Sequence, residues 1–269
     1  MGTNPPILKN VNTKIEGILL SKVAHGERNL LVKLLLRSGK TISVMFYGGR
    51  GGGEKKKSSI LELGTMLKVE LARSNSNSEV YSAKEWQSLW MANKVRDDHL
   101  AFYVLCFIVQ LAAKIAVDEN LHDDSHTFDD HSQGIFRAVS NALVHLESSV
   151  ANKQFLARGE VAIYLGKLLI ELGVFPNIKN CMVCGINLEL FENLTLSADQ
   201  GGFICSTCKP SEQKGPILWS LMNDVANKKT PDISCDPNFT RPNLERLWQY
   251  FCFQFHLNPM DFKTLSMIP

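Results

Sequence analysis

The stretch "TKIEGILLSKVAHGERNLLVKLLLRSGKTISVMFYGG" (Thr13–Gly49) decides the fold, because it divides into three short apolar runs separated by turn residues. The runs are interrupted at "HGER" (His25–Arg28) and at "RSGK" (Arg37–Lys40). A glycine among polar residues between two apolar runs is typical of a β-hairpin turn. We therefore expect three strands, each leading through a tight turn into the next.

Two further strands are expected at "GTMLKVELARS" (Gly64–Ser74) and "NSEVYSAKEW" (Asn77–Trp86), joined by a polar tip. Leu67, Val69 and Leu71 alternate with charged residues, which indicates a strand with one buried and one solvated face. Five short strands in about eighty residues suit a small barrel, and the OB-fold is a five-stranded barrel of this size.

From about Trp86 the apolar residues follow helical spacing instead. Helices are expected over 89–117, 132–146, 153–173, 217–225 and 243–256. Gly173 ends the third of these helices, and Pro242 suits the first turn of the last. We predict an α+β protein with an OB-fold nucleic-acid-binding domain at residues 1–85. An all-helical domain at 86–269 would follow, with a zinc-ribbon-like insert at about 178–212.

The composition is that of an ordinary globular protein, with 269 residues of which 45% are apolar and 21% charged. The opening "MGTNPPILKN" lacks the basic stretch and apolar run of a signal peptide. The most apolar segment, Leu100–Val117, is short for a membrane span and contains Lys114. We therefore expect a buried helix there, and a cytoplasmic protein with no membrane partner.

Four cysteines form the pattern C-x2-C-x20-C-x2-C, which is typical of a zinc ribbon. The candidate metal ligands are Cys181, Cys184, Cys205 and Cys208. Two Cys-x-x-Cys turns can complete a tetrahedron around one ion, with Zn–S bonds of about 2.3 Å. Four sulfur ligands leave no position for a water molecule, so we predict one structural rather than catalytic Zn²⁺. Gly185 and the pair Gly201–Gly202 would let the backbone turn tightly beside the sulfurs.

The other three cysteines, Cys106, Cys235 and Cys252, are scattered and are expected to be core or free thiols. Disulfides are rare inside cells, and a thioredoxin-like redox pair would need a single Cys-x-x-Cys near a βαβ pattern.

Three further patterns imitate catalytic or binding motifs. His25–Glu27 matches the H-x-E of zinc deaminases, but Cys181 is not preceded by the required proline. Gly39–Thr41 ends like a phosphate-binding loop, yet Leu34 replaces the earlier glycine and a strand follows. The His- and Asp-rich stretch Leu121–Ser132 is expected to be a solvated loop. We therefore expect no catalytic residues and a protein that is not an enzyme.

The front of the chain is basic. Residues 1–90 carry fourteen Lys and Arg against seven Asp and Glu, a charge of +7, although the whole chain carries only +2. Such an asymmetry favours a polyanionic partner, although a solvated face would give the same pattern. The candidate DNA-binding residues on the expected barrel are Arg28, Lys33, Arg37, Lys40, Arg50, Lys55, Lys56, Lys57 and Arg73.

Aromatic residues on an OB-fold can stack on the bases of a single strand. Phe46, Tyr47 and Tyr81 are available, and only one of the adjacent pair Phe46 and Tyr47 can face a binding groove. The glycine-rich "GGRGGGEKKK" can follow an irregular phosphate backbone. Phosphate contacts carry no sequence information, so little sequence specificity is expected.

Three segments resemble the bacterial DNA repair protein RecO family. "EGILLSKVAHGERNLLVKLLLRSGKTISVMFYGGRG" resembles its opening strands. "FLARGEVAIYLGKLLIELGVFPNIKNCMVCG" resembles its long helix and first cysteine pair, and "GGFICSTC" resembles its second pair. The resemblance covers about residues 13–257, and the cysteine spacing is its most specific element.

This resemblance implies a DNA-binding recombination mediator of the bacterial cytoplasm, associated with the nucleoid and acting after DNA damage. Such a protein binds ssDNA and dsDNA and anneals complementary strands. With RecR it helps load RecA onto ssDNA coated by the single-strand-binding protein SSB. The resemblance also implies that all four cysteines hold zinc and that the helical domain contacts the acidic C-terminal tail of SSB.

Arg158 falls where the family often has an arginine, and it is the candidate partner-binding residue. Gly159 departs from the family, which commonly has an aromatic residue there. An RNA-binding or translation-linked module with an OB-fold and a zinc ribbon remains the alternative, as does a scaffold that binds no nucleic acid.

Overall fold

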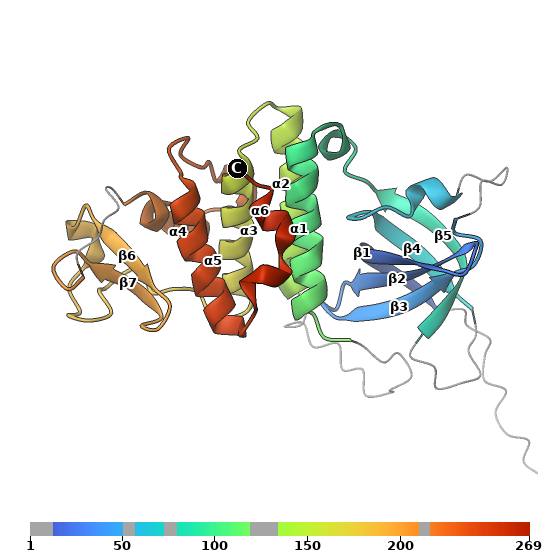
Figure 1. Cartoon of the computed structure of the whole chain (residues 1–269), viewed down its shortest axis with the longest axis horizontal. Coiled ribbons are helices and arrows are strands. Elements are labelled where there is room, and N and C mark those ends of the chain that lie inside the picture. Colours follow the sequence, from blue (N-terminus) through green and yellow to red (C-terminus); the bar gives the residue numbers. More distant parts are fainter. Residues whose placement is uncertain (1–12, 51–56, 73–79, 119–133, 210–215) are drawn as a thin grey trace, which may run out of the picture.

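The computed structural model describes residues 13–50, 57–72, 80–118, 134–209 and 216–269. Figure 1 shows three parts in a row: a β-barrel, a helical body, and a small two-stranded module at the far end from the barrel. The predicted fold class is confirmed, since a closed five-stranded barrel precedes the helices and a four-cysteine cluster lies within the helical half.

The barrel strands are β1 (Lys14–His25), β2 (Asn29–Leu36), β3 (Thr41–Phe46), β4 (Met66–Leu71) and β5 (Val80–Trp90). They close in the order β1-β2-β3-β5-β4, with β1 antiparallel to β4 and β3 parallel to β5. This is the small closed barrel expected of an OB-fold. Alternate residues of each strand fill its interior, among them Val32, Val44 and Val69, which have no exposed surface.

The two predicted hairpin turns are confirmed. Gly26 and Gly39 adopt φ values of 65° and 81°, which a side chain would strain. The Leu36 N–H donates to the Lys40 carbonyl over 2.8 Å. The segment "RSGK" is therefore a hairpin turn with a strand on each side, and no helix follows it to hold a phosphate.

The helical pattern expected from Trp86 is wrong for its first residues, because β5 continues to Trp90. Trp86 lies opposite Val69 on β4, and its ring meets Phe46 edge-on at a centroid distance of 5.1 Å. Pairing with β4 therefore outweighs the local helical spacing. The domain limits at residues 85 and 86 remain a prediction, and β5 runs across them.

The helices of the described residues are α1 (His99–Ile115), α2 (Gly134–Ala151), α3 (Ala157–Glu171), α4 (Ile217–Asn227), α5 (Arg241–Phe255) and α6 (Lys263–Ser266). The helix expected at 153–173 begins later, because Lys153 follows the end of α2 in left-handed backbone with a φ of 58°. Gly173, with a φ of 72°, follows its end as predicted. No helix in the described part of the chain is long and apolar enough to cross a membrane.

The barrel and the helical body share a core. Ile18, Leu20 and Leu35 belong to the same buried cluster as the residues of α1. At the start of β3, the Thr41 N–H donates to the Val117 carbonyl (2.8 Å), and the Thr41 hydroxyl donates to Asp118 Oδ1 (2.6 Å). The end of α1 is therefore fastened to the barrel by hydrogen bonds as well as by apolar contact.

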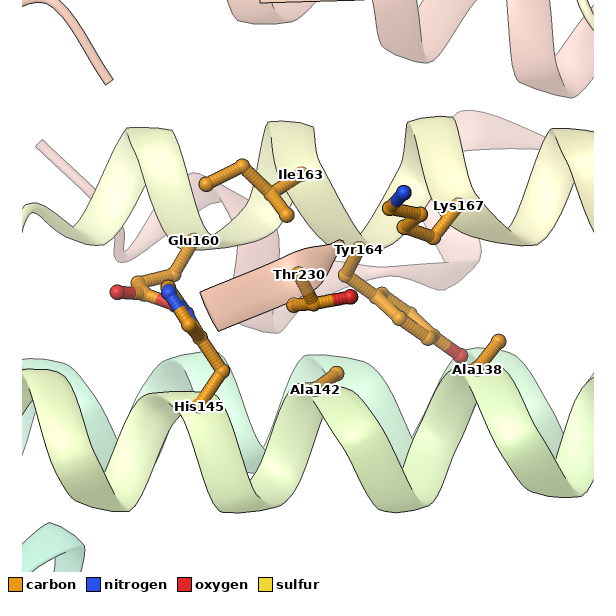
Figure 2. Close-up of a pocket in the computed structure, with 8 residues that line it drawn as sticks. All are labelled: Ala138, Ala142, His145, Glu160, Ile163, Tyr164, Lys167 and Thr230. Carbon is orange, nitrogen blue, oxygen red and sulfur yellow. The ribbon is translucent and has the colours of Figure 1, made fainter. Parts of the chain in front are cut away.

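A buried polar cluster lies between α2, α3 and the short turn η5 (Thr230–Asp232), around a cavity of about 10 Å³ (Figure 2). His145 Nδ1 lies 2.8 Å from Glu160 Oε2, and Lys167 Nζ donates to the Val225 carbonyl over 2.7 Å. These polar groups have partners, and the cavity is too small for more than a single water molecule. We interpret the cluster as structural.

Candidate metal centre and nucleic-acid interface

The four predicted metal ligands come together in the two-stranded module. Cys181 and Cys184 precede β6 (Leu194–Ser197), Cys205 ends β7 (Gly202–Cys205), and Cys208 follows it. The four sulfur atoms all lie within 4.8 Å of one another, and those of Cys184 and Cys205 are 3.7 Å apart. Four sulfurs at about 2.3 Å from one tetrahedral ion would be about 3.8 Å apart. The donor set and its spacing therefore fit zinc.

The backbone around the sulfurs turns where the glycines predict. Gly185 has a φ of 74°, and its N–H donates to the Cys181 carbonyl over 2.9 Å. The Cys205 N–H points at the sulfur of Cys181 over 3.4 Å. A Cβ on Gly202 would lie 2.9 Å from the Asn177 carbonyl, so that position has no room for a side chain.

The thiols of the cluster influence one another. Burial raises the pKa of Cys181, but the backbone N–H groups of Cys184, Cys205 and Val183 outweigh it and lower the pKa to about 6. Contact with the Cys184 thiol, then burial, raises the pKa of Cys208 to about 12. A divalent cation held by all four would favour the thiolate form of each.

The module is anchored on the helical body. Trp219 of α4 donates its indole N–H to the Ile178 carbonyl over 2.8 Å. The Tyr250 hydroxyl of α5 donates to the carbonyl of Val174 (3.1 Å). Cys181 and Cys205 are buried within the same core cluster as the helices. The cysteine cluster therefore lies where an ion would fasten the module to the helices.

Two of the candidate DNA-binding residues, Lys33 and Arg37, form ion pairs with other residues of the protein. Lys33 Nζ lies 2.9 Å from Asp118 Oδ1. Arg37 Nη2 lies 2.8 Å from Glu16 Oε2, and its guanidinium lies over the ring of Phe136 on α2, 5.4 Å from the centroid. These contacts tie the barrel to the helical half. Their carboxylate partners are distant in the sequence, so no sequence pattern indicates them.

Arg28 and Arg50 are exposed, and the structure brings them together. The Arg50 N–H donates to the Arg28 carbonyl (2.9 Å), and the Arg50 guanidinium donates to the Gly26 carbonyl (3.3 Å). Tyr47 lies at the same end of the barrel, since it directly follows β3 and the next residue, Gly48, donates its N–H to Asn29 Oδ1 (3.1 Å); Tyr47 is 60% exposed. We call this end of the barrel, formed by His25, Arg28, Tyr47 and Arg50, the barrel tip.

The aromatic residues divide as the alternation of strands requires. Phe46 has no exposed surface and Tyr81 only 5%, so both belong to the barrel core. Tyr47 alone of the three candidates offers its ring to a ligand. Sequence reasoning singled out the pair Phe46 and Tyr47 but left open which of them is exposed.

The remaining candidates are placed as follows. Lys40 is half-buried in the β2–β3 turn. Lys55, Lys56 and Arg73 lie outside the described residues, as does the His- and Asp-rich stretch 121–132. Lys57 begins the turn η1 (Lys57–Ile60), but its side chain is not among those described.

Arg158 lies half-buried in the first turn of α3. The neighbouring Gly159 faces Cys235, where an added Cβ would come within 2.5 Å of the Cys235 Cβ. The helix therefore packs so closely here that the aromatic residue common in the family would have no room. The role of Arg158 in partner binding remains a prediction.

The structure therefore combines a small closed barrel, which has two exposed arginines at one end, with a helical body that carries a four-cysteine cluster. No family model matches the sequence. Among curated proteins, the chain is similar to the DNA repair protein RecO of Leptospira biflexa, with 20% identity over 219 residues, which are 81% of this chain and 80% of that protein. It is also similar to the DNA repair protein RecO of Bacillus cereus, with 22% identity over 200 residues, 74% of this chain and 72% of that protein. These matches support a resemblance at the level of the family.

Proposed function

We propose that this protein is a non-enzymatic DNA-binding protein of DNA repair and recombination. One observation carries the proposal: the closed OB-fold barrel presents two arginines and an exposed tyrosine together at its tip. The similarity to proteins named DNA repair protein RecO, over about three quarters of the chain or more, supports the same role.

The finer proposal is that of a RecO-like recombination mediator. It would bind ssDNA and dsDNA, anneal complementary strands, and act with RecR to help load RecA onto SSB-coated ssDNA. Annealing brings two anionic strands together, so it needs a cationic surface that neutralises phosphates and releases their counterions. Arg28 and Arg50 supply that charge at the barrel tip. The C-terminal tail of SSB would bind the helical body, with Arg158 as the candidate contact.

Zinc has a structural role in this proposal. Cys181, Cys184, Cys205 and Cys208 would hold one Zn²⁺, which supplies cross-linking rather than chemistry because no coordination position is left for a substrate. The module of β6 and β7, which holds the cluster, lies at the opposite end of the molecule from the barrel (Figure 1). The ion would therefore support DNA binding only through the stability of the helical half.

The proposal is tested by fluorescence anisotropy with single-stranded DNA, duplex DNA and RNA of equal length, at two salt concentrations. The protein should first be shown to contain about one zinc per chain by elemental analysis. Salt-sensitive DNA binding supports the proposal. A clear preference for RNA would favour the translation-linked alternative, and no binding at low salt would favour the scaffold.

The mediator function needs a second measurement. Annealing of complementary strands coated with SSB should be faster with this protein than without it, and RecR should promote RecA loading only in its presence. DNA binding without either effect would leave a DNA-binding protein that is not a mediator.

A further inference from the structure

The outward face of β1, β2 and β3 carries a stripe of apolar side chains. Val23 lies opposite Leu31, and Leu31 lies opposite Met45. Leu31 and Met45 alternate with residues of the barrel core, so their side chains point outward, and Val23 shares this face through its pairing with Leu31. Val23 is 61% exposed, and the other two are half-buried. We call Val23, Leu31 and Met45 the outer stripe.

The outer stripe is bordered by the row of Lys33 on one side and by the barrel tip on the other. On the side of the helical body, the next row on the same face contains Lys33, whose charge is neutralised by Asp118. On the other side is the barrel tip, where His25 lies opposite Asn29 and Tyr47 directly follows β3. The charges at the tip are those of Arg28 and Arg50, with Glu27 as the acidic residue of the same turn.

The cations of the tip are available for a ligand. Within the described residues, no ion pair involves Arg28 or Arg50, and the hydrogen bond of the Arg50 side chain goes to a neutral carbonyl. Several other described cations of the barrel have carboxylate partners, as in the pair Lys84–Glu70 and the pair Lys22–Glu62. Among the described residues of the barrel, Arg28 and Arg50 are therefore exposed cations without an ion pair, at the end that carries the exposed ring of Tyr47.

We propose that Tyr47 stacks on an unpaired base at the barrel tip and thereby makes this surface prefer single-stranded over duplex DNA. This inference rests on the proposed function and assigns its strand preference to one side chain. Arg28 and Arg50 would hold the phosphates on either side of the stacked base, and the outer stripe would support the next bases.

Strand preference follows from what each form of DNA can present. The bases inside a duplex are stacked on both faces, so a duplex offers the tip mainly its phosphates. A single strand offers phosphates and free base faces at once, and an aromatic side chain binds any base because every base has a π-face. Charge complementarity selects this occupant, since the exposed tyrosine shares the barrel tip with two arginines, and phosphates alternate with bases along a strand.

The test compares Tyr47→Ala and Tyr47→Phe with the unaltered protein, using a thymidine oligonucleotide and a duplex of equal length at one salt concentration. Removing the stacking of one base reduces affinity by roughly fivefold to a hundredfold. We expect Tyr47→Ala to weaken single-strand binding by that factor, with duplex binding unchanged within about twofold. Tyr47→Phe retains the ring and should bind as the unaltered protein does.

The matched control is Phe253→Ala, because Phe253 is an aromatic side chain of similar exposure (54%) on α5 in the helical body. It should change neither affinity. Equal melting temperatures for all variants would show that the fold is intact. A photoreactive oligonucleotide containing 5-iodouracil should also cross-link to Tyr47, which mass spectrometry can identify.

The possible failures can be told apart. If the unaltered protein binds neither DNA at low salt, the proposed function and this inference both fail. If it binds DNA but Tyr47→Ala binds the single strand equally well, only this inference is wrong. Equal reductions in affinity for single strand and duplex would also overturn it, because Tyr47 would then act on the phosphate backbone common to both.

Discussion

His145 Nδ1 lies 2.8 Å from Glu160 Oε2, and this contact joins α2 to α3 at a place where the two side chains are only 14% and 8% exposed. The hydrogen bond that His145 donates to the Glu160 carboxylate raises the pKa of His145, while burial acts in the opposite direction. Figure 2 shows the two side chains pointing toward each other at one end of the small cavity. The pair therefore stabilises the fold most when the histidine is protonated.

This pair predicts that stability falls as the pH rises. A raised pKa means that the contribution is complete below the unfolded value of about 6.5 and is lost as the pH rises through the folded value. Urea unfolding at several pH values between 6 and 9 should show this decline. Glu160→Gln should be less stable at pH 6 by about 1–3 kcal/mol, since it leaves a buried group poorly paired, and its stability should depend less on pH.

A control for the pH experiment lies between the same two helices. Arg137 pairs with Glu171, but its side chain is 63% exposed. Arg137→Gln should cost less than about 1 kcal/mol and should keep the pH profile of the unaltered protein. If Glu160→Gln and the unaltered protein give parallel profiles, His145 does not cause the pH dependence.

The cysteine cluster predicts a metal-dependent fold. Cys181→Ser should lose zinc and lower the melting temperature by several degrees, because a structural ion contributes directly to folding free energy. DNA binding measured well below that temperature should persist, since the cluster is remote from the barrel. Cys106→Ser, outside the cluster, should retain zinc. Retention of both zinc and melting temperature by Cys181→Ser would contradict a metal site.

Close packing at Gly159 predicts a strong steric effect. Gly159→Ala would bring a Cβ within 2.5 Å of the Cys235 Cβ and 2.9 Å of its sulfur. Overpacking of this kind costs roughly 1–3 kcal/mol. Adding Cys235→Gly should restore part of that stability, and a double-mutant cycle by urea denaturation measures the coupling. Additive effects of the two changes would mean that the backbone relaxes without strain.

The barrel arginines should divide into two functional groups. Arg28→Ala and Arg50→Ala should each lower the salt dependence of single-strand binding, by about 0.7 in the slope of log K against log salt for each phosphate that is no longer neutralised. Arg37→Ala should change the slope less, because Arg37 is held by Glu16 and Phe136. It should instead reduce stability slightly. The reverse order of slopes would show that phosphate displaces Glu16 from Arg37.

The lysines of the glycine-rich segment give a separate prediction that rests on sequence alone. Replacing Lys55, Lys56 and Lys57 together by alanine should flatten the same salt slope, since the variant would neutralise fewer phosphates. An unchanged slope would remove these lysines from the binding surface. Unfolding measurements should show little effect, because the segment "GGRGGGEKKK" holds no apolar residue that could contribute to a core.

The parts of the structure that depend on local patterns could be predicted from the sequence. The alternation around Val69 indicated the strand β4, and the glycines in "HGER" and "RSGK" indicated the hairpins. The spacing of the cysteines indicated the cluster, because each pair is brought together by its own short turn. Each of these features is decided by residues close together in the chain.

Contacts between distant residues could not be predicted. Helical spacing beyond Trp86 concealed the last residues of β5, because pairing with β4 is decided by residues near position 69. Lys33 and Arg37 were candidates for DNA binding, and their ion pairs with Asp118 and Glu16 could not be foreseen. His145, whose side chain is only 14% exposed, was also missed, although its place between the buried Leu143 and Leu146 on α2 was a usable signal.

The attachment of α1 to the barrel has a mechanical consequence. β5 leads into this helix through the short turn η2 (Lys94–Asp97), and Thr41 holds the segment just beyond its other end. A rod of 17 residues, about 25 Å long, is thereby pinned near both ends to the same barrel. A force applied to the barrel would therefore pass along α1 into the helical body. We therefore expect the barrel and the helical body to move together rather than to rotate about a single hinge.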